Sequence, residues 1–449
     1  MKLIPGVIPE IHKPELRILA GILPIPNDAV ESFDFVVDEF SHLPRCVIRF
    51  KDFGEKRLAS MDGLGIGAPI TFSIVEADVA NKKYKVGKMT NGLTNLELTP
   101  LSISKIHSSG DAGNLGHVEL LLEHPWKMFM DFSSHAYAGE ADSEIIRKLV
   151  ENAEGRGFDF EDIDSKMFFS SDEDGSIPRY KCGEGDYDFI LNRVLPYTTI
   201  NKYPAEFWVD ELNRVHLDTY KNMYQSDPKV VIFFGAEGDV DDNVKAAGAS
   251  TNGLAFAKSK LIKIGTDDPN EIISIMKPCV SIDDVSHLLT YTGNLFPKIA
   301  GGKFKKGLAD KSHIPIMFEP MAMNDATAKK VYRNRPLSDL KALAMREQEP
   351  FNSLFTIEVE TTFCGNLVQT GDNVQLYVPN DKTQTPPAKH WANGKWHVRA
   401  IRYTYDKGTL QNTLTLCRPS FDINKLNTSV TNIDDYYAVG MVSNLMKNM

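Results

Sequence analysis

Short runs of apolar or alternating residues, separated by Gly, Asn, Asp and Pro, dominate the first part of this 449-residue chain. Between residues 15 and 132 they recur at the spacing of β-strands joined by turns. The clearest runs are residues 33–37, 46–50, 70–75 and 118–122. Since side chains alternate between the two faces of a strand, such runs can cover one side of a core. The spacing therefore predicts a β-barrel or a β-sandwich.

The pattern changes to a mixed one after Trp126. A capping Asp142 or Ser143 precedes a helical apolar face, and Gly155 and Gly157 follow it. That face consists of Ile145, Ile146, Leu149, Val150 and Ala153. A second capped helix is expected from Asp186 to Leu195, before Pro196, and residues 206–210 and 214–218 form a hairpin candidate. We expect a small α+β module here.

Strand-like runs return in the C-terminal half, at residues 229–234 and 254–264. Residues 354–416 read as a second β section, in which a turn at residues 406–408 joins two strands. The strands predicted in this section are residues 373–378, 396–405 and 409–416. Between the two stretches, residues 239–253 are expected to form a loop, and short helices are expected at residues 282–292 and 337–347.

The charge balance argues against a broad phosphate-binding surface. Lys and Arg total 50 against 60 for Asp and Glu, which gives a net charge of -10. The densest basic run, residues 302–307, is short and is interpreted as a solvated loop. Pro5 and Pro9 interrupt any signal-peptide core, and no apolar run approaches the roughly 20 residues that cross a bilayer. We expect no stable membrane insertion.

The cysteines indicate a reducing compartment. Five of them are widely separated and form no Cys-x-x-Cys pair: Cys46, Cys182, Cys279, Cys364 and Cys417. Neither a disulfide framework nor a zinc knuckle is expected, so buried, reduced thiols are the default.

Candidate chemistry is sparse and does not converge. Residues 172–176 and 239–243 loosely resemble calcium loops, but neither has the completing glutamate, so solvated acidic loops are favoured. Residues 63–69 precede a β run and are favoured as a turn over a phosphate loop. Four histidines are too irregularly spaced for a ligand set: His107, His117, His124 and His135. Trp208, Trp391 and Trp396 are favoured as core or interface residues over sugar-stacking ones.

No His-Glu-x-x-His, Gly-x-Ser-x-Gly or Gly-Lys-Ser/Thr motif is present. The sequence therefore assigns no catalytic residue, no cofactor-binding residue, no metal ligand and no cofactor, and a non-enzymatic role is expected. The alternative from another class is a cell-wall-binding or peptidoglycan-hydrolysing tail protein.

Several fragments, in this order, resemble the hub family of contractile injection systems, which includes phage late control D proteins and the N-terminal half of VgrG proteins. The fragments are residues 141–149, 186–193, 207–209, 369–376, 394–398 and 413–418. They are similar to a capped helix, an Asp-Phe-hydrophobic-x-Arg helix, an aromatic hairpin that displays a side chain, a Gly-Asp-x-Val-x-Leu strand, a Gly-x-Trp-x-Val strand and a Leu-x-Leu-x-Arg return.

The resemblance implies an α+β, mainly β fold, with two tail-tube-like β-barrels around a small α+β module and an insertion. It implies a first barrel at residues 1–132, the module at 133–225, the start of the second barrel and a mixed insertion at 226–350, the rest of that barrel at 351–420 and a C-terminal tail at 421–449.

The same resemblance implies a structural role in the tail baseplate of a virion, assembled in the host cytoplasm. A homotrimer would join the six-fold tail tube to a three-fold spike, supplied as a separate protein. Tail tube proteins, baseplate wedge proteins and the tape measure protein are the implied partners, and DNA meets the hub only in transit through its channel. The hub of a non-contractile tail or of a secretion system remains an alternative.

Overall fold

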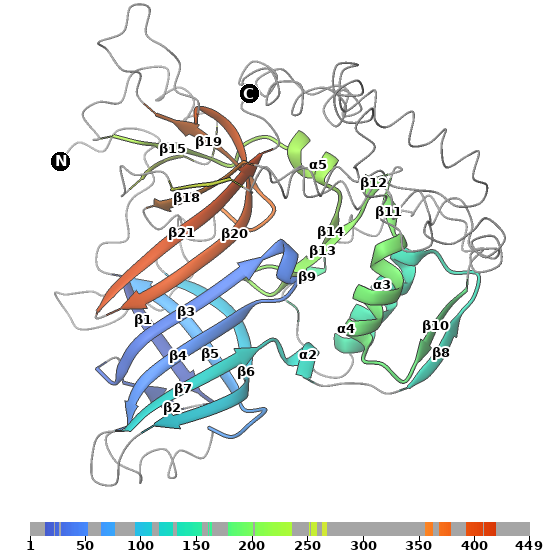
Figure 1. Ribbon diagram of the computed structural model, residues 1–449, viewed down its shortest axis with the longest axis horizontal. Coiled ribbons are helices and arrows are strands. Elements are labelled where there is room, and N and C mark those ends of the chain that lie inside the picture. The colour runs from blue at the N-terminus through green and yellow to red at the C-terminus, as the bar shows by residue number, and fades with distance from the viewer. Residues whose placement is uncertain are drawn as a thin grey trace, which may run out of the picture.

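The structure of the protein is a computed structural model (Figure 1). The residues that it describes are 14–21, 23–26, 28–52, 64–76, 95–109, 116–128, 133–154, 160, 162–163, 178–200, 203–235, 251, 253–257, 263–266, 355–361, 368–378, 392–406 and 408–418.

One sheet of 14 strands forms the body of the molecule within these residues. Its first half, the N-terminal β unit, consists of β1 (Pro14–Ala20), β2 (Leu23–Ile25), β3 (Val30–Asp38), β4 (Arg45–Asp52), β5 (Pro69–Glu76), β6 (Asn95–Ser109) and β7 (Gly116–Glu123). Its second half, the C-terminal β unit, consists of β15 (Val230–Phe233), β16 (Leu254–Phe256), β17 (Lys263–Thr266), β18 (Phe355–Thr361), β19 (Asn373–Tyr377), β20 (Gly394–Asp406) and β21 (Thr409–Arg418).

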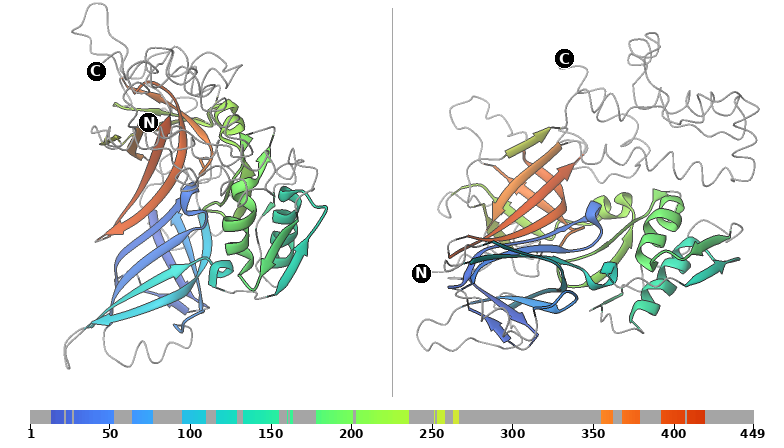
Figure 2. Two further views of the ribbon diagram at one scale, coloured as in Figure 1. Left: turned by 45° about the vertical axis from the view of Figure 1, so that its right-hand side comes forward. Right: turned by 60° about the horizontal axis from the view of Figure 1, so that its bottom comes forward.

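The N-terminal β unit is antiparallel, with the strand order β3-β4-β7-β6-β5-β1-β2. Its strands bury every second side chain, as Phe33, Phe35 and Val37 show on β3. The four strands predicted at residues 33–37, 46–50, 70–75 and 118–122 are confirmed. The sheet curls around this apolar face (Figure 2).

The C-terminal β unit has the strand order β17-β18-β21-β20-β19-β15-β16. Here β15 runs parallel to β16 and β19, and the other pairs are antiparallel. The strands predicted at residues 229–234, 373–378, 396–405 and 409–416 are confirmed. The predicted run 254–264 contains two elements rather than one, because β16 pairs with β15 while β17 pairs with β18.

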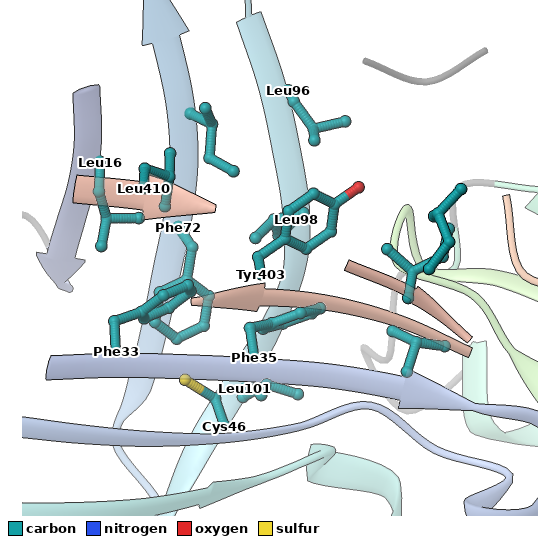
Figure 3. Close-up of a cluster of buried hydrophobic side chains, with 14 of the residues drawn as sticks. Leu16, Phe33, Phe35, Cys46, Phe72, Leu96, Leu98, Leu101, Tyr403 and Leu410 are labelled. Atoms are coloured by element: carbon teal, nitrogen blue, oxygen red, sulfur yellow. The ribbon is translucent and has the colours of Figure 1, made fainter. Parts of the chain in front are cut away.

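The long β20–β21 hairpin joins the two units. One edge of β20 pairs first with β19, through residues 394–397, and then with β3, through residues 400–406. Tyr403 on β20 and Leu410 on β21 point into the N-terminal β unit, among Leu16, Phe33 and Phe72 (Figure 3). The two units therefore share one hydrophobic core, and the hairpin of the second covers the apolar face of the first.

The α+β module has its own core and lies beside the sheet (Figure 1). Its elements are α2 (Pro125–Met128), β8 (Ser134–Tyr137), α3 (Asp142–Glu154), β9 (Asp162–Ile163), β10 (Arg179–Cys182), α4 (Asp186–Phe189), η2 (Ile190–Val194), η3 (Leu195–Tyr197), β11 (Thr199–Ile200), β12 (Tyr203–Pro204), β13 (Glu206–Val209), β14 (Arg214–Asp218) and α5 (Tyr220–Gln225). The 3-10 turn η1 (Glu39–Ser41) connects β3 to β4 and contacts β13.

Both predicted helices and the predicted hairpin of the module are confirmed, but the predicted cap of the second helix is wrong, because Gly185 precedes it and offers no side chain. The helix at 142–153 is α3, whose five predicted apolar residues are all buried. The second helix starts at Asp186 but changes geometry, through a π-helical stretch at Ile190–Val194 and a 3-10 turn that begins at Leu195. Pro196 fits that turn because a residue in the first turn of a helix makes no intrahelical hydrogen bond through its N–H, which proline lacks.

The fold class, mainly β with few helices, is confirmed. Several sequence predictions fall outside the described residues: the loops at 172–176, 239–243 and 302–307, the helices at 282–292 and 337–347, the tail at 421–449, and Gly155, Gly157, Cys279, Cys364 and Trp391.

Candidate functional site: a buried polar junction

The β13–β14 turn lies between both β units and contacts each of them. On the N-terminal side, the Thr99 backbone N–H donates to the Glu211 carbonyl at 2.8 Å, and the Thr99 hydroxyl donates to the Asp210 carbonyl at 2.8 Å. On the C-terminal side, the Glu211 carboxyl faces Thr370 in the segment that precedes β19. The turn therefore connects the module to both units at one place.

Asp210 builds this turn from inside. Its carboxylate is fully buried, and Oδ1 accepts backbone hydrogen bonds from Leu212 and Arg214, each at 2.9 Å. Its Oδ2 lies 3.1 Å from Arg214 Nε and 2.9 Å from His216 Nε2. Asn213 has a positive φ of 62°, a left-handed conformation that Asn tolerates better than most residues. The local sequence thus specifies a tight, charge-paired turn.

Glu211 is a buried carboxyl with weak hydrogen-bond partners. It is fully buried, and its Oε2 accepts long hydrogen bonds from the Thr370 N–H and hydroxyl, at 3.5 and 3.4 Å. Its Oε1 has no hydrogen-bond partner among the described residues. Burial first, and then the charge of Asp210, raise the pKa of Glu211 to about 8.

Trp208 ties β13 to the segment before β19. Its indole Nε1 donates to the Thr370 carbonyl at 3.3 Å, and its ring stacks on His216 at 4.8 Å between centroids. Gly371 has a φ of 98°, and a Cβ there would lie 2.5 Å from Trp208 Cζ2. Only glycine combines this backbone conformation with this approach of the ring.

One expectation from the family resemblance is wrong at this hairpin. Phe207, Trp208 and Val209 are all buried, so none of them is displayed. The reason is that both faces of β13 are covered: Phe207 and Val209 belong to the core of the module, while Trp208 packs with Met223 on the other side.

The 3-10 turn η1 is inserted between the module and β20. Glu39 Oε1 lies 2.7 Å from His397 Nε2, and both side chains are fully buried. Burial raises the pKa of Glu39, although the contact with His397 opposes this shift. On the other side, the Val209 N–H donates to the His42 carbonyl at 2.8 Å, and His42 Nδ1 lies 2.6 Å from the Phe207 carbonyl oxygen.

The end of α5 is fixed to the C-terminal β unit by side-chain amide and amine donors. Asn373 Nδ2 donates to the Ser226 carbonyl at 2.9 Å and to the Met223 carbonyl. Lys395 Nζ donates to the carbonyls of Tyr224 and Ser226. These donors satisfy carbonyls that a short helix leaves free at its C-terminus.

Together these contacts make a three-way connection. Hydrogen bonds from η1, the β13–β14 turn and α5 converge on β20 and on residues 369–373. Among the described residues, no three His, Cys, Asp or Glu side chains form a group that could hold a metal ion. The arrangement connects the module to both β units through hydrogen bonds.

The four histidines that the sequence singled out lie in different places. His107 and His135 are exposed on β6 and β8, and His117 pairs with Glu31 at 2.8 Å on the surface. His124 is buried, with Nε2 3.2 Å from Asn213 Oδ1 and Nδ1 accepting the Trp126 N–H at 3.2 Å. Burial lowers the pKa of His124 to about 4.

The tryptophans and cysteines were predicted with mixed success. Trp208 and Trp396 are buried, as expected for core residues, and Arg418 lies over the Trp396 ring at 4.0 Å. Cys46 and Cys417 are buried, but Cys182 is exposed, so the expectation of buried thiols is wrong there. The reason is alternation along β10, which turns Arg179 and Lys181 inward and Tyr180 and Cys182 outward.

The buried acids of the junction were not predicted from the sequence. Glu39, Asp210 and Glu211 stand in turns, where charged residues are ordinarily solvated. The sequence offers one signal for the junction, the two motifs at residues 207–209 and 369–376. The structure brings these motifs together through Trp208 and Thr370.

Comparison with solved structures finds two tail proteins and a component of a secretion system. A tail protein from Neisseria meningitidis MC58 matches with a TM-score of 0.47 and 10% identity, over 91% of this chain and 97% of that one. The 43 kDa tail protein of prophage MuSo2 from Shewanella oneidensis matches with a TM-score of 0.48 and 9% identity, over 90% and 98%. The c3393 protein of E. coli, a component of the type VI secretion system, matches with a TM-score of 0.43 and 11% identity, over 91% and 77%.

No family model matches the sequence, and no curated protein matches it. Within the described residues, no helix combines the length and the apolar character needed to cross a membrane.

Proposed function

We propose that this protein is a structural, non-enzymatic hub of a tail baseplate, in which three copies form a ring between a six-fold tail tube and a three-fold spike. The observation that carries the proposal is the division of the 14-stranded sheet into two β units that one hairpin joins. Each chain then offers two β surfaces, fixed relative to one another by a shared core.

A threefold ring of such chains has six β units. If the two units of each chain take alternate places around the ring, subunits of a six-fold tube meet six related surfaces although only three chains are present. Closed cyclic symmetry of this kind is the usual form of soluble homo-oligomers. Because each chain contains two β units, a three-fold ring can match a six-fold tube.

The ends of the sheet support contacts between copies. Within the described ranges, β2 and β17 each pair with a strand along one edge only, whereas Ala257, directly after β16, bridges to Thr361 of β18. Open strand edges are ready to pair with another chain, and natural proteins cover or close them. In the proposed ring, edges of this kind are covered by the neighbouring copies.

The buried polar junction supports a structural role. It fixes the module to both β units through hydrogen bonds that water does not reach, as in the fully buried Glu39–His397 pair. A hub that receives a tube on one side and a spike on the other has to hold its parts at fixed angles.

The proposed partners are tail tube proteins, a spike supplied as a separate protein, baseplate wedge proteins and the tape measure protein. DNA is in contact only during transit, and the net charge of -10 suits a channel wall that repels it. This role of the charge is tested by replacing acidic residues of the channel wall with lysine. DNA ejection at the normal rate in such a variant contradicts the idea that the charge of the wall repels DNA.

Electron microscopy of the purified protein mixed with tail tube protein tests the proposal. Caps with three-fold symmetry and six sites of contact at tube ends support it. Protein that stays off the tubes, or that decorates their sides, contradicts it.

The alternative of a cell-wall enzyme or glycan-binding protein is tested by a zymogram. Intact peptidoglycan after incubation with the purified protein is the result expected of a hub. The burial of Trp208 and Trp396 also removes both as sugar-stacking platforms. The hub of a non-contractile tail or of a secretion system shares the geometry, and a sheath gene beside this one favours the contractile case.

A further inference from the structure

The junction contains one titratable group at the contact between two parts of the chain. The Glu211 carboxyl lies at the interface between the module and the C-terminal β unit and is fully buried. Its two hydrogen bonds, both from Thr370, are long at 3.4 and 3.5 Å. Two long hydrogen bonds compensate poorly for removing a charge from water.

We propose that Glu211 is a proton-dependent clasp. While its carboxyl is protonated, the β13–β14 turn stays seated against Thr370 and the C-terminal β unit, and loss of the proton loosens that contact. This inference concerns a conformational equilibrium within one chain, so it stands or falls independently of the hub role.

Titratable and charged groups face the clasp from several elements. The charges that act on Glu211 itself are Asp210 and Arg214 of the same hairpin. Around them, His216 pairs with Asp210, His124 contacts Asn213, and Lys229, His216 and His397 act on Asp372 in the segment before β19. From β6 the contact is Thr99, which does not titrate. Burial and Asp210 disfavour the ionised form of Glu211, while the backbone N–H groups of Glu211 and Thr370 and the charge of Arg214 favour it, and burial outweighs these three.

The β13–β14 turn contacts the two β units through different groups, and only one of these contacts involves the Glu211 carboxyl. The contacts of the turn with β6 use backbone carbonyls and the Thr99 side chain, which do not depend on the proton. Only the contact with Thr370 uses the carboxyl itself. The Thr370 donors favour an ionised Glu211, but burial of the carboxyl outweighs them, so ionisation disfavours the seated turn on the side of the C-terminal β unit. The hydrogen bonds to Thr99 on the N-terminal β unit stay in place.

The direction of the pH effect follows from linkage. Because the pKa of Glu211 is raised to about 8 in the closed state, the closed state holds a proton that the open, solvated state releases. The contact is strongest below the ordinary pKa of a glutamate and is lost as pH rises toward 8. One proton changes the opening equilibrium by up to about tenfold per pH unit in that window.

Hydrogen exchange of the backbone amides of Thr370 and Gly371 tests the clasp in the full chain, between pH 5.5 and 8.5 and after correction for the intrinsic rate. We expect the opening equilibrium of the wild type to rise with pH. In Glu211→Gln, whose amide stays neutral, the rise should vanish and the segment should stay protected. Glu97→Gln, which removes an exposed carboxyl two residues from Thr99 on the same strand, should keep the wild-type rise.

An equal pH dependence in the wild type and in Glu211→Gln overturns the proposal. If Glu211→Gln does not fold, Glu211→Met provides a second neutral side chain for the same comparison. The wild type alone is also decisive, because protection of Thr370 and Gly371 that does not change between pH 5.5 and 8.5 overturns the clasp without any variant.

Discussion

Arg179 donates two hydrogen bonds to the carboxylate of Asp142, at 2.8 and 2.7 Å, and so joins strand β10 to the first residue of α3. Two residues along the same strand, Lys181 pairs with Asp186, the first residue of α4. Both pairs are buried. One strand therefore holds the N-termini of both helices, where negative charge also suits the helix dipole.

Breaking the Arg179–Asp142 pair should destabilise the module strongly. We expect Arg179→Met to lower the free energy of unfolding by about 3–5 kcal/mol, because a buried carboxylate loses its partner. Arg179→Met combined with Asp142→Leu should cost less than the single change. Chemical denaturation followed by circular dichroism measures both. Arg147→Met, on the exposed face of α3, is the control and should cost under about 0.5 kcal/mol; a similar loss in all the variants contradicts the account.

Gly371 should tolerate no side chain. Gly371→Ala is expected to cost about 2 kcal/mol or more, since the new Cβ meets Trp208 and the backbone has a positive φ. Gly408→Ala is a matched control with a φ of 87° and no atom within 4 Å of the added Cβ. It carries only the backbone strain, about 1 kcal/mol. Thermal unfolding of the two variants should therefore differ, and equal losses count against the close approach of the Trp208 ring.

The buried His124 should make the protein sensitive to acid. Its pKa is about 4 in the folded chain and 6.5 when unperturbed, so the unfolded state binds the extra proton as pH falls between these values. The contribution of neutral His124 to the free energy of unfolding is therefore complete above pH 6.5 and is lost as the pH falls toward 4. The loss is about 3 kcal/mol at most. His124→Gln should flatten the acid limb of the stability curve. His107→Gln, at an exposed position on β6, should leave that limb unchanged.

The β20–β21 hairpin should be required by the N-terminal β unit. Residues 1–225 expressed alone lack Tyr403 and Leu410, which cover Phe33, Phe35 and Phe72. We expect this fragment to bind a hydrophobic dye and to lack a cooperative unfolding transition. In the full chain, Tyr403→Ala should cost about 3–5 kcal/mol, by the loss of a large buried side chain. A fragment that unfolds cooperatively as a monomer contradicts the shared core.

Local pattern was enough to predict most of the described strands and the two helices of the module. Runs such as residues 33–37 and 396–405 alternate with period two, and the apolar face of α3 repeats with the period of a helix. These signals depend on neighbouring residues only, which is why they are visible in a single sequence.

The relationship between the β units was beyond the same reasoning. The pairing of β20 with β3 joins residues more than three hundred positions apart, and nothing in either strand specifies its partner. The junction was hidden for a related reason. Glu39, Asp210 and Glu211 occupy turns, and only tertiary packing buries them.

The mass of the intact oligomer, measured by native mass spectrometry, tests the central claim most directly. Three copies of the 50.2 kDa chain in one closed assembly is the predicted result, because only three chains place six β units around a ring. A protein that remains a monomer or a dimer at micromolar concentration, or that forms a six-chain ring, contradicts the account.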